Sequence, residues 1–288
     1  MLIHVNQIII KVKIILFSIV ISFLISGCSP IAAIGAVGST VAKTVENALE
    51  EEEPKPAGTQ ISREQRLEEI AAANLNLGIA YMQQGEYRKA LEKLNRAKLA
   101  KNDYPPVYNA LGLLYQKLGE NELAESNYKH GINLNPNDSL ALNNYGQFLC
   151  TTGRFEEAES VFKESSENPF NKNPEIAISN AGTCALTHDQ PDKAEAYFTR
   201  ALVINPKVSP ALLQMAELSF DQGNYLLARD YLNRYLENAR HTSRSLWLGI
   251  RIEHELGDKD ALSSYALLLR NNFPDTEEAR LLEDSGMR

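Results

Sequence analysis

A repeat of 34 residues is the feature that most constrains how this chain can fold. The segments "GEYRKALEKL", "GENELAESNY", "GRFEEAESVF", "DQPDKAEAYF", "GNYLLARDYL" and "GDKDALSSYA" align with one another. Their first residues, which we call the turn residues, are separated by 34, 34, 36, 34 and 34 positions and are Gly85, Gly119, Gly153, Asp189, Gly223 and Gly257. A helical bundle with chance spacing would not keep five steps so similar, so the sequence predicts a stack of six repeated units.

Small residues at fixed distances from the turn residues indicate that each unit is a pair of closely packed helices. Five positions after the turn stand Ala90, Ala124, Ala158, Ala194 and Ala228, with Ala261 displaced by one. Seven positions before it stand Gly78, Gly112, Gly146, Gly182, Ala216 and Ile250. This pattern resembles the tetratricopeptide repeat family. The resemblance implies an all-α fold, a right-handed superhelix of six helix-turn-helix repeats over residues 63–288, which a short helix in "DTEEARLLEDSGMR" would cap.

An apolar stretch near the N-terminus predicts a signal peptide. It runs from Ile14 to Ile25 after Lys11 and Lys13, and it is shorter than the roughly 18 to 20 residues that a membrane-spanning helix needs. It ends in "LISGC", which resembles the bacterial lipobox, with Ile25 where Leu is commonest. The resemblance implies that residues 1–27 are removed and that Cys28 carries lipid. The alternative is an uncleaved helix with an ordinary cysteine.

Residues 28–62 predict a flexible tether between the lipid and the repeats, because they combine small residues, prolines and a run of four Glu at positions 50–53. In lipoproteins of Gram-negative cells an Asp after the cysteine favours the inner membrane, so Ser29 favours the periplasmic face of the outer membrane. The cleaved chain would have 27 basic and 37 acidic residues, a net charge of −10 that disfavours nucleic acid as a partner.

Two cysteines in adjacent units predict a disulfide. Cys150 lies three positions before its turn residue and Cys184 five positions before its own, so both belong to first helices that pack side by side. The periplasm is oxidising, which favours a bond between them, and two separate buried thiols are the alternative. We expect no metal site, because the pair has neither a nearby histidine nor a CxxC spacing.

No motif in the sequence indicates catalysis or a cofactor. The segment "HELGD" at His254 lacks the second histidine of a zinc-protease helix, and no nucleophile elbow, phosphate-binding loop or dinucleotide fingerprint is present. An enzyme with an unrecognised site would need clustered titratable groups, which only Glu217, Arg251 and His254 approach. The sequence therefore favours a binding protein over an enzyme.

The stacked first helices predict a binding groove. We expect the residues ten, six and three positions before each turn to face it. They are Leu75, Ile79, Met82, Asn109, Leu113, Gln116, Asn143, Gln147, Ser179, Thr183, Leu213, Glu217, Phe220, Trp247, Arg251 and His254. The groove would be apolar at its start, where packing explains the pattern equally well. Its amide-rich middle suits an extended peptide, whose backbone offers donors and acceptors in turn.

Two segments, "NNYGQFLC" and "SLWLGIRI", make the resemblance more specific than a generic repeat. With the surrounding sequence from Ala71 to Leu282 they resemble the type IV pilus biogenesis and stability lipoproteins, the pilotins of the pilus secretin. The resemblance implies a non-enzymatic assembly factor whose partners are secretin subunits, the lipoprotein sorting machinery and the outer membrane. The alternative is a general periplasmic scaffold that docks peptidoglycan enzymes or proteases at that membrane.

Overall fold

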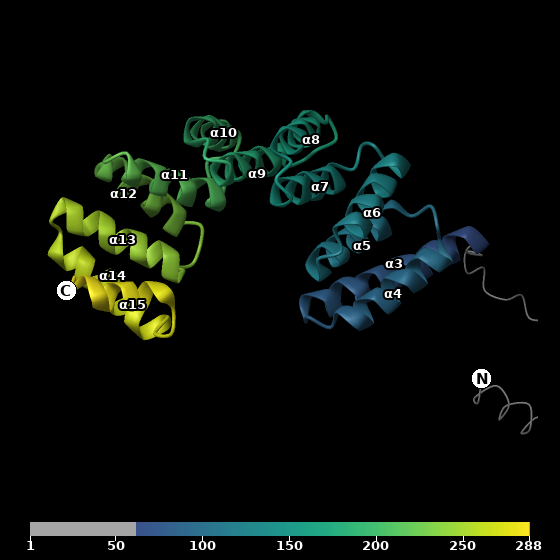
Figure 1. Ribbon diagram of the computed structural model, residues 1–288, viewed down its shortest axis with the longest axis horizontal. Coiled ribbons are helices and arrows are strands. Elements are labelled where there is room, and N and C mark those ends of the chain that lie inside the picture. The colour runs from purple at the N-terminus through teal and green to yellow at the C-terminus, as the bar shows by residue number, and fades with distance from the viewer. Residues whose placement is uncertain (1–61, 288) are drawn as a thin grey trace, which may run out of the picture. The chain divides into compact units, whose positions relative to one another are not determined.

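The computed structural model describes residues 62–287, and every regular element among them is an α-helix. None of the described helices is long and apolar enough to cross a membrane. In chain order (Figure 1) they are α3 (Arg63–Gln83), α4 (Tyr87–Ala100), α5 (Pro105–Leu118), α6 (Asn121–Leu134), α7 (Ser139–Thr151), α8 (Phe155–Glu167), α9 (Pro174–Thr187), α10 (Pro191–Ile204), α11 (Ser209–Asp221), α12 (Tyr225–Leu236), α13 (Ser243–Leu256), α14 (Lys259–Asn272) and α15 (Glu277–Ser285).

The first twelve of these helices form six pairs, α3 with α4 through to α13 with α14, and α15 packs against both helices of the last pair. This arrangement confirms the prediction of six tetratricopeptide units with a short capping helix. We call the first and second members of each pair the first and second helices. Apolar residues of α15, among them Ala279 and Leu282, are buried with Leu246 and Ile250 of α13, so the last unit is covered.

Local sequence explains where the helices begin and how each pair turns. Ser62 caps α3 in a reciprocal capping box with Gln65, and proline stands in the first turn of α5, α9, α10 and α11. The five turn glycines have φ between 74° and 79°, in the left-handed region that glycine adopts without strain. Asp189 holds the same place in the fourth unit with φ of 55°, and it is the one non-glycine residue with positive φ among those described.

The two helices of a pair cross where a large side chain meets a residue that lacks one. The ring of Tyr128 on α6 lies over Gly112 on α5, where an added Cβ would come within 2.7 Å of the ring atoms. Phe162 meets Gly146 and Phe198 meets Gly182 in the same way, each pair 16 residues apart. All three rings are at most 1% exposed, so the missing side chain sets the crossing distance.

The sixth unit keeps this spacing but shifts it by one residue relative to its turn. Tyr265 packs over Gly249, again 16 positions apart, although Gly249 lies eight and not seven positions before Gly257. The sequence alignment, which placed Ile250 at the small position, was therefore wrong for this unit. The displaced Ala261 belongs to the same shift.

The first helices line one side of the array. Each first helix contacts the next one along the chain, from α3 through α5, α7, α9 and α11 to α13. No two second helices contact one another within residues 62–287. The first helices are therefore closer together than the second helices, and the array curves with the first helices on its inner surface (Figure 1).

The two extra residues of the third unit lie in the connection between α8 and α9. The side-chain amide of Asn168 donates to the carbonyl oxygen of Asn137 at 2.9 Å, and that of Asn171 donates to Ser165 at 2.8 Å. These bonds tie the connection to the end of its own unit, so it projects as a bound surface loop with Phe170 74% exposed at its tip.

The contact between ring and glycine predicts that a methyl group added at the glycine lowers the free energy of unfolding, and that the loss depends on how tightly the ring is packed. We expect Gly112→Ala to lower the free energy of unfolding by about 1 to 3 kcal/mol, because the new Cβ overlaps a ring with no free space. Gly249→Ala is the matched comparison, since its Cβ would meet the half-buried Tyr265 at 3.0 Å and that ring has room to move. Urea unfolding measures both, and a larger loss for Gly249→Ala would contradict this account.

Candidate functional site

Asparagine pairs join neighbouring first helices across the middle of the inner surface. The side-chain amide of Asn144 on α7 donates to the carbonyl oxygen of Asn109 on α5 at 3.0 Å. One repeat further, the amide of Asn180 on α9 donates to Asn143 on α7 at 2.9 Å. We call these four residues the asparagine ladder. Asn109 and Asn143 are two of the residues that the sequence placed in an amide-rich groove.

The ladder leaves hydrogen-bonding groups unused. Asn109 and Asn143 accept through their oxygens, and their amide nitrogens donate to nothing within residues 62–287. Asn144 and Asn180 donate, and their oxygens accept no bond within the same range. Asn144 and Asn180 are half-buried, so their unused oxygens lie at the surface, whereas Asn109 and Asn143 are 7% and 8% exposed and their unused donors are almost covered. Unused groups of both kinds can bond the backbone of an extended peptide, which offers its own donors and acceptors.

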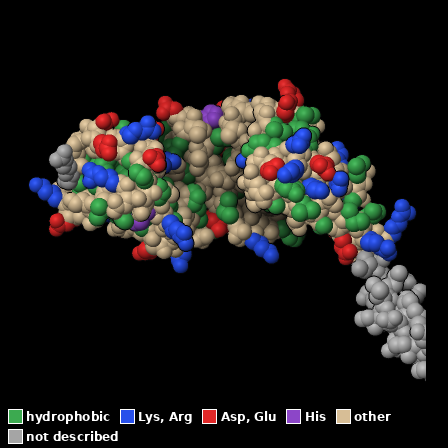
Figure 2. All heavy atoms as spheres, turned by 90° about the horizontal axis from the view of Figure 1, so that it is seen from below, with side chains coloured by type: hydrophobic (Ala, Val, Ile, Leu, Met, Phe, Trp, Pro, Cys, Tyr) green, Lys and Arg blue, Asp and Glu red, His purple; other side chains and the backbone are tan. Residues whose placement is uncertain are grey.

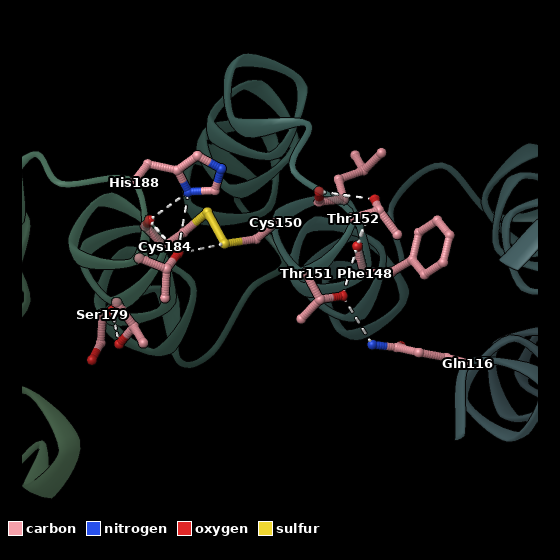
Figure 3. The surroundings of a disulfide bond; sticks show 11 residues. Gln116, Phe148, Cys150, Thr151, Thr152, Ser179, Cys184 and His188 are labelled. Atoms are coloured by element: carbon pink, nitrogen blue, oxygen red, sulfur yellow. Dashed lines mark hydrogen bonds between the residues drawn. A yellow bond between two sulfur atoms is a disulfide. The ribbon is translucent and has the colours of Figure 1, made fainter. Parts of the chain in front are cut away.

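A second row of polar contacts joins the ends of the same helices, and Figure 3 shows most of it. The amide of Gln116 on α5 donates to the hydroxyl of Thr151 on α7 at 3.4 Å, and Tyr128 donates its hydroxyl hydrogen to Gln116 at 3.0 Å. Cys150 on α7 lies 3.5 Å from the hydroxyl of Thr187 on α9. In both cases the residue three positions before the turn residue of one unit contacts the residue two positions before the turn residue of the next unit.

Cys150 and Cys184 form a disulfide between α7 and α9, with their Cα atoms 5.8 Å apart (Figure 3). The expectation that no histidine lies near this pair was wrong. His188 is the residue that follows the end of α9, four positions after Cys184. Its ring nitrogen lies 3.1 Å from the carbonyl oxygen of Cys184 and within 4.8 Å of both sulfur atoms. The sulfurs are bonded to each other, so they offer no thiolate to a metal ion in this state.

The apolar start of the predicted groove belongs mainly to the core. Leu75 and Met82 are 7% and 8% exposed and pack with α4 and α5, and Ile79 and Leu113 are half-buried against the same cluster. Ser179, predicted for the middle of the groove, is 2% exposed, and its hydroxyl has no partner in the structure. Thr183 donates to the carbonyl oxygen of Ser179 at 3.2 Å, and Gln147 is exposed.

The far end of the inner surface is aromatic and charged, as the sequence indicated. The guanidinium of Arg251 on α13 lies 4.1 Å from the centre of the Phe220 ring on α11, and Glu217 pairs with Arg244. Trp247 and Leu213 are half-buried and His254 is exposed. Glu217, Arg251 and His254 form no hydrogen bond or ion pair with one another among the described residues. They pair instead with Arg244, Asp221 and Glu255.

The shifted register of the sixth unit also changes which residues correspond to the groove positions. Measured from Gly249, these positions are Leu246, Ile250 and Glu253, which are 0%, 0% and 4% exposed. Leu246 and Ile250 are covered by α15, and Glu253 pairs with Arg229 of α12. The groove positions defined by Gly257 are therefore not equivalent to those of the other units.

Sequence reasoning missed the polar contacts that link one unit to the next. Six positions after the turn, Glu125 on α6 accepts a bond from Tyr145 at 3.1 Å and pairs with Arg154 at 2.8 Å, both in the third unit. Hydrogen bonds from Lys129 and Arg154 lower the pKa of Glu125 to about 2. Glu159 and Arg229 stand at the same position and pair with Lys193 and with Glu253. A charged residue at this position in successive units was the available signal.

Cys28, the signal peptide at 1–27 and the tether up to residue 61 lie outside the described residues. Their assignment therefore stays a prediction from the sequence.

Comparison with known proteins agrees with the fold. Family models described as "TPR repeat" and "Tetratricopeptide repeat" match residues 78–119, 105–138, 127–160 and 185–247. The type IV pilus assembly protein PilF of Pseudomonas aeruginosa is 29% identical over 211 residues, which are 73% of this chain and 84% of PilF. An uncharacterized protein of Haemophilus influenzae is 30% identical over 122 residues, 42% of this chain and 68% of that protein.

Two solved structures extend the likeness. The structure of Pseudomonas aeruginosa PilF has a TM-score of 0.66 and 28% identity, and the match covers 76% of this chain and 99% of PilF. PilW, described as a widely conserved type IV pilus biogenesis factor, has a TM-score of 0.64 and 27% identity, with 74% and 98% covered. The chain therefore belongs to the tetratricopeptide repeat family and is related to its type IV pilus biogenesis proteins, which confirms the resemblance predicted from the sequence.

The low pKa of Glu125 predicts a loss of stability in acid. Because the pKa is about 2 in the folded chain against an ordinary 4.5, the carboxylate stabilises the fold above pH 4.5, and this contribution disappears as the pH falls toward 2. We expect Glu125→Gln to lower the free energy of unfolding by about 1 kcal/mol at neutral pH and to change nothing near pH 2. Glu122→Gln, exposed on the same helix, is the control, and an equal effect of both changes would refute the assignment.

The disulfide closes a loop of 34 residues, so its removal should be costly. We expect the double change Cys150→Ser and Cys184→Ser to lower the free energy of unfolding by about 3 to 4 kcal/mol, since the unfolded chain regains the freedom of that loop. Urea unfolding with and without reductant provides the measurement. Reductant should lower the stability of the unchanged chain to that of the variant and leave the variant unaffected.

Proposed function

We propose that this chain is a pilotin, a lipid-anchored protein of the outer membrane that brings type IV pilus secretin subunits to that membrane and promotes their assembly into a multimer. The observation that carries the proposal is the relationship to PilF, which spans most of both chains. The role is one of binding and assembly, without catalysis.

The inner surface supplies a means of holding a secretin segment. Unused amide donors of Asn109 and Asn143 alternate with unused oxygens of Asn144 and Asn180 across three first helices. A segment in extended conformation presents its own N–H and C=O groups at a similar alternation. Backbone recognition of this kind requires no particular side chain, so it tolerates a partner of varied sequence.

The predicted lipid anchor would determine where a bound secretin subunit is delivered. Lipid on Cys28, handled by the lipoprotein sorting machinery, would carry the chain and a bound secretin subunit to the outer membrane. Confining many such complexes to one membrane raises their effective concentration and favours multimer formation. The tether of residues 28–62 leaves the repeats free to reach subunits at different distances from the bilayer.

The proposal predicts that the secretin multimer depends on both the anchor and the ladder. In a deletion strain, unheated membrane fractions should lack the multimer while secretin monomers accumulate. Cys28→Ala should give the same loss in the outer-membrane fraction, because the chain no longer reaches that membrane. The double change Asn109→Ala and Asn143→Ala should reduce the multimer several-fold while the helical circular dichroism is retained.

Asn127→Ala is the matched control for the ladder, because Asn127 lies on the second helix α6 and donates to its own helix. It should leave the multimer unchanged. A normal multimer in the deletion strain would exclude the pilotin role. An envelope defect with pili intact would instead favour the general periplasmic scaffold.

A further inference from the structure

Charge is distributed unevenly along the described chain. Residues 62–101, which form the first repeat, contain 8 basic and 5 acidic residues, whereas residues 102–287 contain 16 basic and 27 acidic ones. The first repeat thus has a net charge of +3, and the remaining described residues have −11. A difference of this size indicates that the first repeat favours a negatively charged neighbour, whereas the other repeats are repelled by one.

The basic residues gather on the outward face of α4. Ala90, Leu94 and Ala97 form the buried stripe of this helix, and Arg88, Lys89 and Arg96 are exposed on the side away from it. Arg88 has no acidic partner within residues 62–287. Lys89 and Arg96 pair with Glu86 and Glu92 of the same helix, in exposed contacts that a stronger anion can replace.

A hollow adjoins this face. It has a volume of about 730 Å³ and lies between the start of α3 and the end of α4, where Leu67, Leu99, Lys98 and Lys101 line it together with Glu64 and Asp103. Lys101 pairs with Glu68 of α3 at 2.6 Å. Leu99 is 86% exposed, the largest value among the exposed large apolar side chains described. Figure 2 shows basic and apolar side chains at the end of the array that the first repeat forms, with acidic side chains among them. We call the hollow and the outward side of α4 the basic face.

We propose that the basic face docks on an anionic lipid surface. Lys and Arg attract acidic headgroups, while exposed leucines between them enter the boundary of the acyl chains, and this combination distinguishes an interfacial contact from a purely ionic one. The face lies on α4 and the start of α3, away from the asparagine ladder on α5, α7 and α9, so docking leaves the ladder accessible.

Chain connectivity selects a membrane as the partner over an acidic protein. The chain leaves the first repeat at Ser62 toward Cys28, so this repeat is the nearest in sequence to the predicted lipid. The inference rests on that anchor, which is part of the proposed function. Tethering keeps the basic face close to the bilayer, which raises the occupancy of an otherwise weak contact.

The test uses residues 28–288 with Cys28→Ser, so that no lipid contributes, and vesicles of phosphatidylethanolamine and phosphatidylglycerol. We expect sedimentation with these vesicles in about 0.05 M NaCl, loss of binding in about 0.5 M NaCl, and little binding to phosphatidylcholine vesicles. Arg88→Glu with Arg96→Glu should weaken binding by about 25-fold or more, since each basic residue near such a surface contributes about fivefold. Leu99→Ser should weaken it a few-fold.

Matched controls come from α14, the second helix of the last unit. Lys259→Glu with Arg270→Glu changes the net charge equally, both residues are exposed, and binding should stay within about twofold of the unchanged chain. Leu267→Ser is the control for Leu99→Ser. Absence of vesicle binding at low salt, or equal losses in the α4 and α14 variants, would overturn the proposal. Either result leaves the secretin assay untouched, so the two proposals fail separately.

Discussion

The contact between an aromatic ring and a glycine, made in four of the six helix pairs, determines the geometry on which everything else in this structure depends. Tyr128, Phe162 and Phe198 each occupy the space of a missing side chain, so the two helices of the unit cannot change their separation without a void or a clash. The sixth unit shows how strong this constraint is. There the turn moved by one residue, while the 16-residue spacing from glycine to ring stayed the same.

Fixed pairs bring the first helices into register, and that register creates the polar rows of the inner surface. Asn109 meets Asn144 and Asn143 meets Asn180 because each bond joins equivalent positions of successive units. The same rule brings Gln116 to Thr151 and Cys150 to Thr187. Each ladder bond engages one of the two polar groups of each asparagine side chain. The other group is the one that the proposed function assigns to a peptide backbone.

The sequence was sufficient for the fold because the 34-residue period and the small residues report directly on helix pairing. It was less informative about the groove, because facing inward and being accessible are different properties. Leu75, Met82 and Ser179 lie on first helices at predicted groove positions, but neighbouring side chains bury them. Asn144 and Asn180 each follow a predicted groove position by one residue. Only the contact between adjacent units shows that they complete the ladder. Links such as Glu125 to Arg154 depend on side-chain reach across units, which periodicity does not encode.

The charge distribution gives the proposed anchor a further consequence for orientation. The tether predicted for residues 28–62 would hold the first repeat at a root-mean-square distance of about 30 to 35 Å from the bilayer but would not by itself orient the array. A repeat with net charge +3 attached to repeats with −11 supplies that orientation, since an anionic surface attracts the former and repels the latter. The array would then project from the membrane with its far repeats outermost. The asparagine ladder, two to four repeats from the bilayer, would be open to a subunit that approaches through the periplasm.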